Sequence, residues 1–589
     1  MTRLAIAALA IAACGGTSTT ATAPGEGGPR LASNVLRADY AGSPACADCH
    51  GAIYAAWQAS PMRNMTRDAR TATIRAPFDG AQLHTGTDTA TMESQGGARF
   101  IRIDTAQGPS RWRVTKVIGG RYREDFVGVD VTAAADPLTA TGTEHVLPAT
   151  FVFSNQGWRY KGYSVMVKER PRMGFNGVWS QECIACHNTM PLATLLYDDL
   201  YGPSLPAYQG KLQDRVMPAS RAWTTTPRDS DGLATAIRDE IRFLGAAPPR
   251  DGADLREVLP AAARATEERL DGGKLVELGV GCEACHNGSK LHAATPAIKP
   301  TFAVASSLLQ MAPPSGETGT RVQWINHTCA KCHTVLFSRY PWTWEDGTRR
   351  GTDPGGSSTT SGEGRDFQLG HCASQLACTQ CHDPHTMDSR DKLAAEGTTA
   401  GDHLCTTCHA NVPEHSHHKT VGCIGCHMPK KNMGLDYVMD RYHRIGSPDE
   451  PARVEGDRPL ECALCHADKS IEQLVSTMES WWGKTYSRDK LAYLYGKDLT
   501  ANALRATITW GKPHEQAAAM SALGDAKAVD AVAAIAPQLA HDYPLVRFFA
   551  QRALQTITGD PVAIDVGAPA ADVKRAAQAW LAAWQAAHP

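Results

Sequence analysis

Three stretches in the first third of the chain alternate between apolar and polar positions with the period of a β-strand. They cover residues 98–103, 110–129 and 147–167, and they are rich in β-branched and aromatic side chains. Gly-Gly at 119–120 and Asn-Gln-Gly at 155–157 are typical of turns between such strands. We therefore predict a β-rich insert in this part of the chain.

The period changes to that of helices further along the chain. Amphipathic helical patterns cover residues 230–245 and 253–278, and six Ala-rich helical segments follow near the C-terminus. The stretch 542–560 resembles a HEAT-type repeat, which implies a small α-solenoid, although an ordinary helical bundle explains so few units equally well. The six predicted segments are 470–483, 500–508, 514–523, 527–540, 544–557 and 571–587.

The first residues of the chain predict export. Arg3 precedes an apolar run from Leu4 to Ala13, which is too short to cross a bilayer and is typical of a secretory signal. The end of this run, IAAC, resembles a bacterial lipobox, which implies cleavage before Cys14 and lipidation of its sulfur. Gly15 in place of Asp then favours the outer membrane. An ordinary signal peptide cleaved at a nearby small residue is the alternative.

Composition narrows the class of protein. The 589 residues carry 59 basic and 61 acidic side chains, so the basic excess expected of a nucleic-acid-binding protein is missing. A hydrophobic content of 42 % with 13 Trp is not that of a disordered chain. The 18 Cys are too sparse for a small disulfide scaffold, so these sulfurs need another explanation.

Sixteen of the 18 Cys fall in eight copies of Cys-x-x-Cys-His. Two thiols at this spacing form thioethers with the vinyl groups of a haem, and the following His binds the iron. We therefore predict eight covalently attached haem c groups. The predicted haem-binding cysteines are Cys46, Cys49, Cys183, Cys186, Cys282, Cys285, Cys329, Cys332, Cys378, Cys381, Cys405, Cys408, Cys423, Cys426, Cys462 and Cys465. The predicted proximal iron ligands are His50, His187, His286, His333, His382, His409, His427 and His466.

Other uses of paired cysteines do not explain a His after every pair. A zinc ribbon needs two Cys pairs and no such His, and a thioredoxin-like motif occurs once, near a βαβ pattern. Covalent haem attachment takes place outside the cytoplasm, in agreement with the predicted export signal. Ionised haem propionates would bring the formal net charge of −2 to about −18.

Six of the eight motifs lie within residues 282–466. So little chain per haem leaves no room for a core of side chains, and we predict that stacked haems form the core there. Nine further His in this segment could supply the second axial ligand, and a second His gives a low-spin electron carrier. They are His292, His327, His371, His385, His403, His415, His417, His418 and His443.

The sequence resembles multihaem cytochromes c of the c-552/4 type, in the wider group of octahaem hydroxylamine oxidoreductases and pentahaem nitrite reductases. The resemblance spans residues 40 to about 470. It is carried by YAGSPACADCHGAIYAAWQASPM (40–62), CEACHNGSKLH (282–292), LACTQCHDPH (376–385), HSHHKTVGCIGCHMP (415–429) and YHRIGSP (442–448).

The resemblance implies distal iron ligands. Four positions match those of distal His in such proteins, and His371 and His417 come second to them. Met62 stands where relatives often have His, which implies one His/Met haem, unless Met62 only packs. Cys372 belongs to no motif, and a buried free thiol is its commonest role. The four first-choice distal ligands are His292, His385, His418 and His443.

These patterns predict a mostly α multihaem cytochrome with little regular secondary structure around the haems, a β-rich insert and a HEAT-like C-terminal region. The predicted parts are a signal peptide (1–13), a flexible tether (14–38), the first haem, β-rich insert and second haem (39–190), a helical linker (191–281), a six-haem core (282–470) and an α-helical region (471–589).

The favoured function is electron relay in the periplasm or at the outer membrane, with redox proteins or a membrane electron donor as partners. No motif reads CxxCK, so the Lys-ligated catalytic haem of pentahaem nitrite reductases is absent. One alternative is an oxidoreductase with one open haem, acting on a small nitrogen or sulfur compound. The first two haems are its candidates, because only His84 and His145 lie near them as spare His. A docking or assembly subunit is the other alternative.

Overall fold

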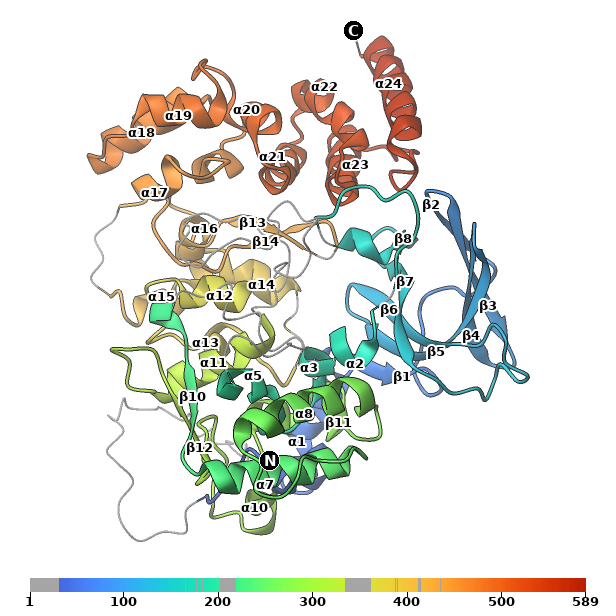
Figure 1. The fold of residues 1–589 in the computed structure, drawn as a ribbon. Coiled ribbons are helices and arrows are strands. Elements are labelled where there is room, and N and C mark those ends of the chain that lie inside the picture. Colours follow the sequence, from blue (N-terminus) through green and yellow to red (C-terminus); the bar gives the residue numbers. More distant parts are fainter. Residues whose placement is uncertain are drawn as a thin grey trace, which may run out of the picture.

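The structure, a computed structural model, has three regions (Figure 1). A β-sheet lies beside a column of short helices, and a layer of longer helices from the C-terminal part of the chain covers one end. The predicted lipidation site Cys14 and the haem-binding Cys183 lie outside the described residues. Those residues are 31–588 without 165, 176, 183, 202–218, 334–361, 387, 389, 411–414 and 435.

The sheet is antiparallel and has eight strands, in the order β2-β3-β4-β5-β6-β7-β8, with β1 paired to the end of β5. Register shifts in β5–β6 and β6–β7 bend it, so that β2 and β8 at its two ends approach each other. Phe126, Trp158 and Phe151 pack in its core. The strands are β1 (Thr66–Asp68), β2 (Gln82–Thr85), β3 (Asp88–Gln95), β4 (Ala98–Thr105), β5 (Gly108–Gly119), β6 (Arg123–Asp130), β7 (Glu144–Val152) and β8 (Gly157–Tyr160).

The prediction of a mostly α protein with little regular structure is wrong. Helices make up 42 % and strands 16 % of the structure, and the sheet is large and nearly closed. The physical reason is that β2 to β7 each pair with the strand that follows in the sequence, so the sheet grows into a unit with its own core. The alternating stretch at 98–103 lies in β4, the stretch at 110–129 runs through β5 and β6, and residues 147–164 run through the end of β7, β8 and the 3-10 turn Lys161–Ser164.

Beside the sheet, α7 (Ser230–Phe243) and α8 (Leu255–Arg269) pack against each other. Each begins at an Asp, Asp229 or Asp254, whose side chain accepts a hydrogen bond from a backbone N–H of the first turn. Their apolar faces share a core with α4 (Leu192–Leu195) and α5 (Tyr197–Tyr201). This core supports the start of the helix column.

The column consists of short helices and two-stranded ribbons. Its helices are α1 (Gly51–Ala59), α2 (Trp179–Glu182), α3 (Ile184–His187), α9 (Cys282–His286), α10 (Lys290–Ala294), α11 (Arg321–His333), α12 (Glu363–Gln368), α13 (Cys378–Cys381), α14 (Arg390–Glu396), α15 (His403–Thr406), α16 (Cys423–His427) and α17 (Pro451–Val454). Its ribbons pair β9 (Asn188–Thr189) with β11 (Glu277–Leu278), β10 (Thr224–Pro227) with β12 (Leu309–Ala312), and β13 (Lys430–Met433) with β14 (Met439–Arg441).

The part of the column between residues 312 and 432 has very few apolar side chains of its own to bury. Of the described residues between 312 and 432, only Ile325, Ala330, Phe367 and Ala377 are buried hydrophobic ones. A stretch of this length needs a larger apolar core to offset its loss of conformational entropy. The column therefore requires an apolar component that is not a side chain.

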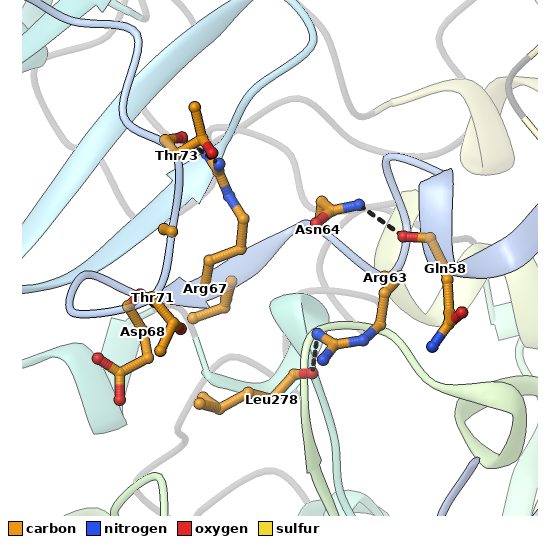
Figure 2. A pocket seen from close by; sticks show the side chains of 10 residues that line it. Gln58, Arg63, Asn64, Arg67, Asp68, Thr71, Thr73 and Leu278 are labelled. Atoms are coloured by element: carbon orange, nitrogen blue, oxygen red, sulfur yellow. Dashed lines mark hydrogen bonds between the residues drawn. The ribbon is translucent and has the colours of Figure 1, made fainter. Parts of the chain in front are cut away.

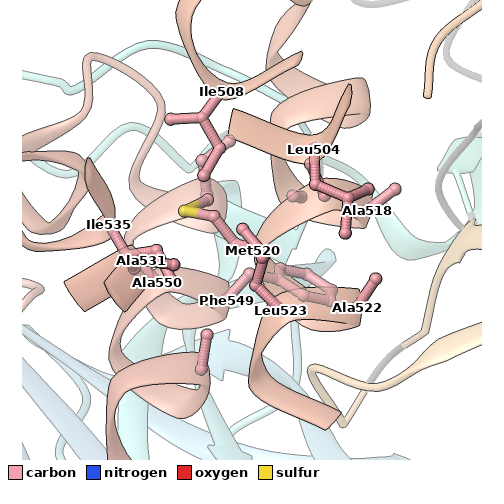
Figure 3. Close-up of a cluster of buried hydrophobic side chains, with 14 of the residues drawn as sticks. Leu504, Ile508, Ala518, Met520, Ala522, Leu523, Ala531, Ile535, Phe549 and Ala550 are labelled. Atoms are coloured by element: carbon pink, nitrogen blue, oxygen red, sulfur yellow. The ribbon is translucent and has the colours of Figure 1, made fainter. Parts of the chain in front are cut away.

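The C-terminal helices have a conventional core. Met520 lies at its centre, among Leu504, Ile508, Leu523 and Phe549 (Figure 3). The same core includes Met433 of β13, so these helices are continuous with the end of the column. The helices are α18 (Ile471–Trp482), α19 (Arg488–Tyr495), α20 (Ala503–Trp510), α21 (Pro513–Asp525), α22 (Val532–Ile535), α23 (Pro544–Thr558) and α24 (Ala570–Ala587).

Among the described residues, no helix combines the length and the apolar character that a membrane span requires.

Candidate haem-binding sites

The Cys-x-x-Cys-His motifs lie on short helical turns. The third and seventh motifs form the whole of α9 and α16, and the fourth ends α11. On a helical turn the residues i and i+3 share one face, so both sulfurs of a motif point the same way. This is the arrangement that two thioether bonds to one planar group need.

The described cysteines are all free, and none of them forms a disulfide. Burial raises the pKa of the Cys285 and Cys462 thiols to about 12 and that of Cys381 to about 11. Such thiols are neutral and held inside the column. They are available for thioether formation with a group that occupies its interior.

Cysteines of different motifs interact with each other, and these interactions place the motifs in series. Hydrogen-bond contacts join the first motif to the third, the second to the fourth, the fourth to the fifth, and the sixth to the seventh. Electrostatic interactions join the third motif to the fourth, the fifth to the sixth, and the seventh to the eighth. The series follows the column from α1 and α10 at one end to α16 and α17 at the other (Figure 1).

Five motif histidines each face a second histidine ring. The distances between ring centres are 6.2 Å for His50 and His292, 6.4 Å for His286 and His385, 6.3 Å for His382 and His443, 6.0 Å for His427 and His415, and 5.8 Å for His466 and His418.

This spacing fits one iron ion between the two rings of a pair. Metal–imidazole bonds of about 2 Å on each side, and about 1.1 Å from each nitrogen to its ring centre, place the centres about 6 Å apart. In the last pair the Nε2 atoms of His418 and His466 point at each other, 3.5 Å apart. The residues present therefore suit bis-histidine haem.

Hydrogen bonds at Nδ1 set the ring tautomer. The Nδ1 atoms of His292, His427 and His443 lie 2.9–3.0 Å from backbone carbonyl oxygens. A carbonyl only accepts, so Nδ1 carries the proton and Nε2 keeps its lone pair. The structure thus prepares Nε2 of these rings for a metal.

Burial keeps other motif histidines neutral as well. It lowers the pKa of both His187 and His286 to about 4, with nearby His385 adding to the effect at His286. Neutral imidazole is the form that binds iron. His333 differs, because its hydrogen bond to Glu363 raises its pKa to about 9.

Three motif histidines, His187, His333 and His409, have no facing histidine ring among the residues that the structure describes. His187 is also notable because its buried Nδ1 has no hydrogen-bond partner in this part of the chain. At these three motifs, the described residues do not supply the second histidine that bis-histidine ligation needs.

The second-choice ligands lie elsewhere. His417 stacks on Trp481 with ring centres 4.3 Å apart, and His371 is exposed on a turn. The ring opposite His50 is that of His292. Within the described residues, neither His417 nor His371 forms a ring contact with a motif histidine, and Met62 as an iron ligand stays a prediction.

Sequence reasoning did not single out His415, whose ring faces His427. It belongs to the HSHH cluster, from which the resemblance selected His418 and, second, His417. The cluster was the available signal, but it does not distinguish its own members. Trp482 donates a hydrogen bond to the carbonyl of His415 and so ties this loop to α18.

A polar surface pocket of about 460 Å³ lies between α1, β1 and β11 (Figure 2). Arg63 donates to the carbonyl of Leu278, and Asn64 donates to that of Gln58. None of the predicted haem-binding residues lines this pocket. The histidine pairs, and not this pocket, are therefore the candidate site.

Comparisons with known proteins agree with the motifs. Residues 371–414 match the model of the doubled CXXCH motif family. The crystal structure of the outer cell wall cytochrome OcwA aligns with 88 % of this chain and 100 % of its own, at 14 % identity and a TM-score of 0.35, too low to support a shared fold. No curated protein matches the sequence.

The family match and the motifs support covalently bound haem c in a multihaem c-type cytochrome, and with it a role in electron transfer.

Proposed function

We propose that the protein is an octahaem c-type cytochrome that relays single electrons along its helix column. The five histidine pairs carry this proposal, because their separation of 5.8–6.4 Å is that of two imidazoles on one iron. Bis-histidine haem is low-spin and has no open position, so it exchanges electrons and does not bind substrate. From these pairs we infer that the distal ligands are His292, His385, His443, His415 and His418.

The contacts between motif cysteines support a relay with a defined order. The order runs from the first motif through the third, fourth, fifth, sixth and seventh to the eighth, with the second beside the fourth. Sulfurs that interact across motifs support a series in which successive porphyrins lie side by side. Electrons can then enter at one end of the column and leave at the other.

We place the protein outside the cytoplasm as a lipoprotein anchored through Cys14, at the periplasmic side of a membrane or at the outer membrane. The signal-like first residues support this location. Its partners are then redox proteins or a membrane electron donor. The C-terminal helices, with a HEAT-like repeat pattern, are the candidate docking region.

A second candidate function is an oxidoreductase that uses one open haem. The absence of a facing ring at His187, His333 and His409 within the described residues favours it. Because His50 has a facing ring, the second motif is a better candidate than the first. The substrate would be a small nitrogen or sulfur compound.

Two measurements on the purified protein test the relay. Its intact mass and pyridine haemochrome spectrum should give eight haems per chain. Low-temperature EPR of the oxidised protein should then show that low-spin haem predominates, with at least five such centres. A high-spin signal that shifts on addition of nitrite or hydroxylamine would establish the second candidate. Fewer than five low-spin haems would contradict the pairing.

A further inference from the structure

The Nδ1 atom of His382 has an anionic partner. It lies 2.9 Å from Oδ2 of Asp388. The corresponding atom of His427, another motif histidine with a facing ring, lies 2.9 Å from the neutral carbonyl oxygen of Gly446. The two rings therefore have the same distance from Nδ1 to the acceptor oxygen and differ in the charge of the group that accepts their proton.

Asp388 is held in place from two sides. Its side chain is only 9 % exposed, and its Oδ1 accepts a hydrogen bond of 2.5 Å from Lys392 on α14. Arg121, in the turn between β5 and β6, donates to the backbone carbonyl of Asp388 at 2.9 Å. The carboxylate is thus fixed relative to His382 by both the column and the sheet.

We propose that Asp388 is a positioning residue that acts through His382 and makes the haem of the fifth motif one of the low-potential members of the series. This inference rests on the proposed haem binding. A hydrogen bond from Nδ1–H to a carboxylate makes the ligating nitrogen a stronger electron donor. Stronger donation favours ferric over ferrous iron in the one-electron couple, in which an external reductant supplies the electron.

The neighbouring fourth motif has a related but longer contact. Glu363 Oε2 lies 3.5 Å from Nδ1 of His333. Because Cys329 of the fourth motif contacts Cys378 of the fifth, the two carboxylates act on adjacent positions in the middle of the series. Electrons would then pass through a central step of low potential. The test below concerns Asp388, where the contact is short.

Asp388→Asn removes the charge and keeps the size of the side chain. A spectroelectrochemical titration of the holoprotein, with dithionite as reductant, should show one haem component that is easier to reduce. At fixed potential its ratio of reduced to oxidised form should rise about tenfold, which equals about 59 mV for one electron. EPR should show that this haem stays low-spin.

Two further variants complete the test. Lys392→Gln removes the cation that partly neutralises Asp388, so it should move the same component in the opposite direction. Asp391→Asn removes an exposed charge that lies on the helix of Lys392 and three residues after Asp388, and it should leave that component in place.

The inference is overturned if Asp388→Asn leaves every component unchanged, or if Asp391→Asn produces the same shift. It is also overturned if Asp388→Asn prevents haem attachment and Lys392→Gln moves no component. The haem count separates these results from failure of the proposed function. A wild-type protein without covalent haem would refute both, whereas eight haems with unmoved potentials would refute only the role of Asp388.

Discussion

At the scale of single residues, the group that accepts the Nδ1 proton decides how each histidine can bind iron. Backbone carbonyls fix His292, His427 and His443 with Nε2 unprotonated, and Asp388 does the same for His382 with a negative charge. Hydrogen bonds within the polypeptide therefore orient these histidine rings for iron without any contribution from the metal.

We expect His443→Ala to convert one haem from low spin to high spin, because its ring faces that of His382 with centres 6.3 Å apart. EPR of the oxidised protein measures the change. His84→Ala is the matched control, since His84 lies in β2 and bonds to Thr89. An unaltered spectrum in His443→Ala would remove this residue from the ligand set.

The HSHH cluster offers a comparison between near neighbours. His415→Ala should create a high-spin haem, because His415 faces His427 with ring centres 6.0 Å apart. His417→Ala should keep all low-spin signals, because that ring stacks on Trp481 instead. The EPR spectra of the two variants decide which histidine is the iron ligand. A high-spin signal from His417→Ala alone would assign His417, and not His415, as the ligand opposite His427.

At the scale of elements, the loop that holds this cluster is shared by the column and the C-terminal helices. Trp481 stacks on His417, and Trp482 donates to the carbonyl of His415. Both tryptophans belong to α18, the first C-terminal helix. Its packing thus positions the loop that faces the seventh and eighth motifs.

A buried histidine makes the stability of the C-terminal helices depend on pH. His541 precedes α23, accepts a hydrogen bond from the backbone of Tyr543 at Nδ1, and bonds to Gln516 of α21 through Nε2. Burial lowers its pKa from 6.5 to about 4, so the folded state holds the neutral ring. The unfolded chain takes up the proton first as the pH falls.

The contribution of His541 is therefore complete above pH 6.5 and is lost as the pH falls from 6.5 to about 4. It should amount to at most about 3 kcal/mol of unfolding free energy. Denaturant unfolding followed by helical circular dichroism at pH 7 and pH 4.5 measures it. His541→Gln should lose less stability over this interval than the wild type, and equal losses would contradict the prediction.

At the scale of the whole molecule, the sheet, the C-terminal helices and the unit built around α7 and α8 have side-chain cores, and the described part of the column between residues 312 and 432 does not. The sheet buries its aromatic cluster around Phe126, and the C-terminal helices bury theirs around Met520. In the described residues between 312 and 432, four buried hydrophobic side chains cannot replace such a core. We expect porphyrins to supply this core.

Protein produced without haem attachment should therefore keep the sheet and the C-terminal helices and lose the column. Hydrogen exchange followed by mass spectrometry should show at least about tenfold lower protection within residues 282–430, with β3 to β6 and α20 to α23 still protected. The holoprotein is the control. Equal protection of the column in both forms would mean that side chains suffice to fold it.

The sequence alone determined the chemistry, because haem attachment is local. Two thiols and a histidine within five residues make a complete attachment site, whatever the rest of the chain does. The same holds for the strand periodicity of the sheet, because alternation is read from neighbouring residues. The density of motifs in residues 282–466 also predicts a porphyrin core for the column.

Only the tertiary structure decided which histidines meet and how large the sheet becomes. His292 is far from His50 in the chain, and the choice of His415 over His417 depends on how the loop lies against α18. The wrong prediction of a mostly α protein has the same origin. The size of the sheet depends on the pairing of β1 with β5 and on the approach of β2 to β8. A second ligand and a closing sheet both depend on contacts between distant residues, which local patterns do not specify.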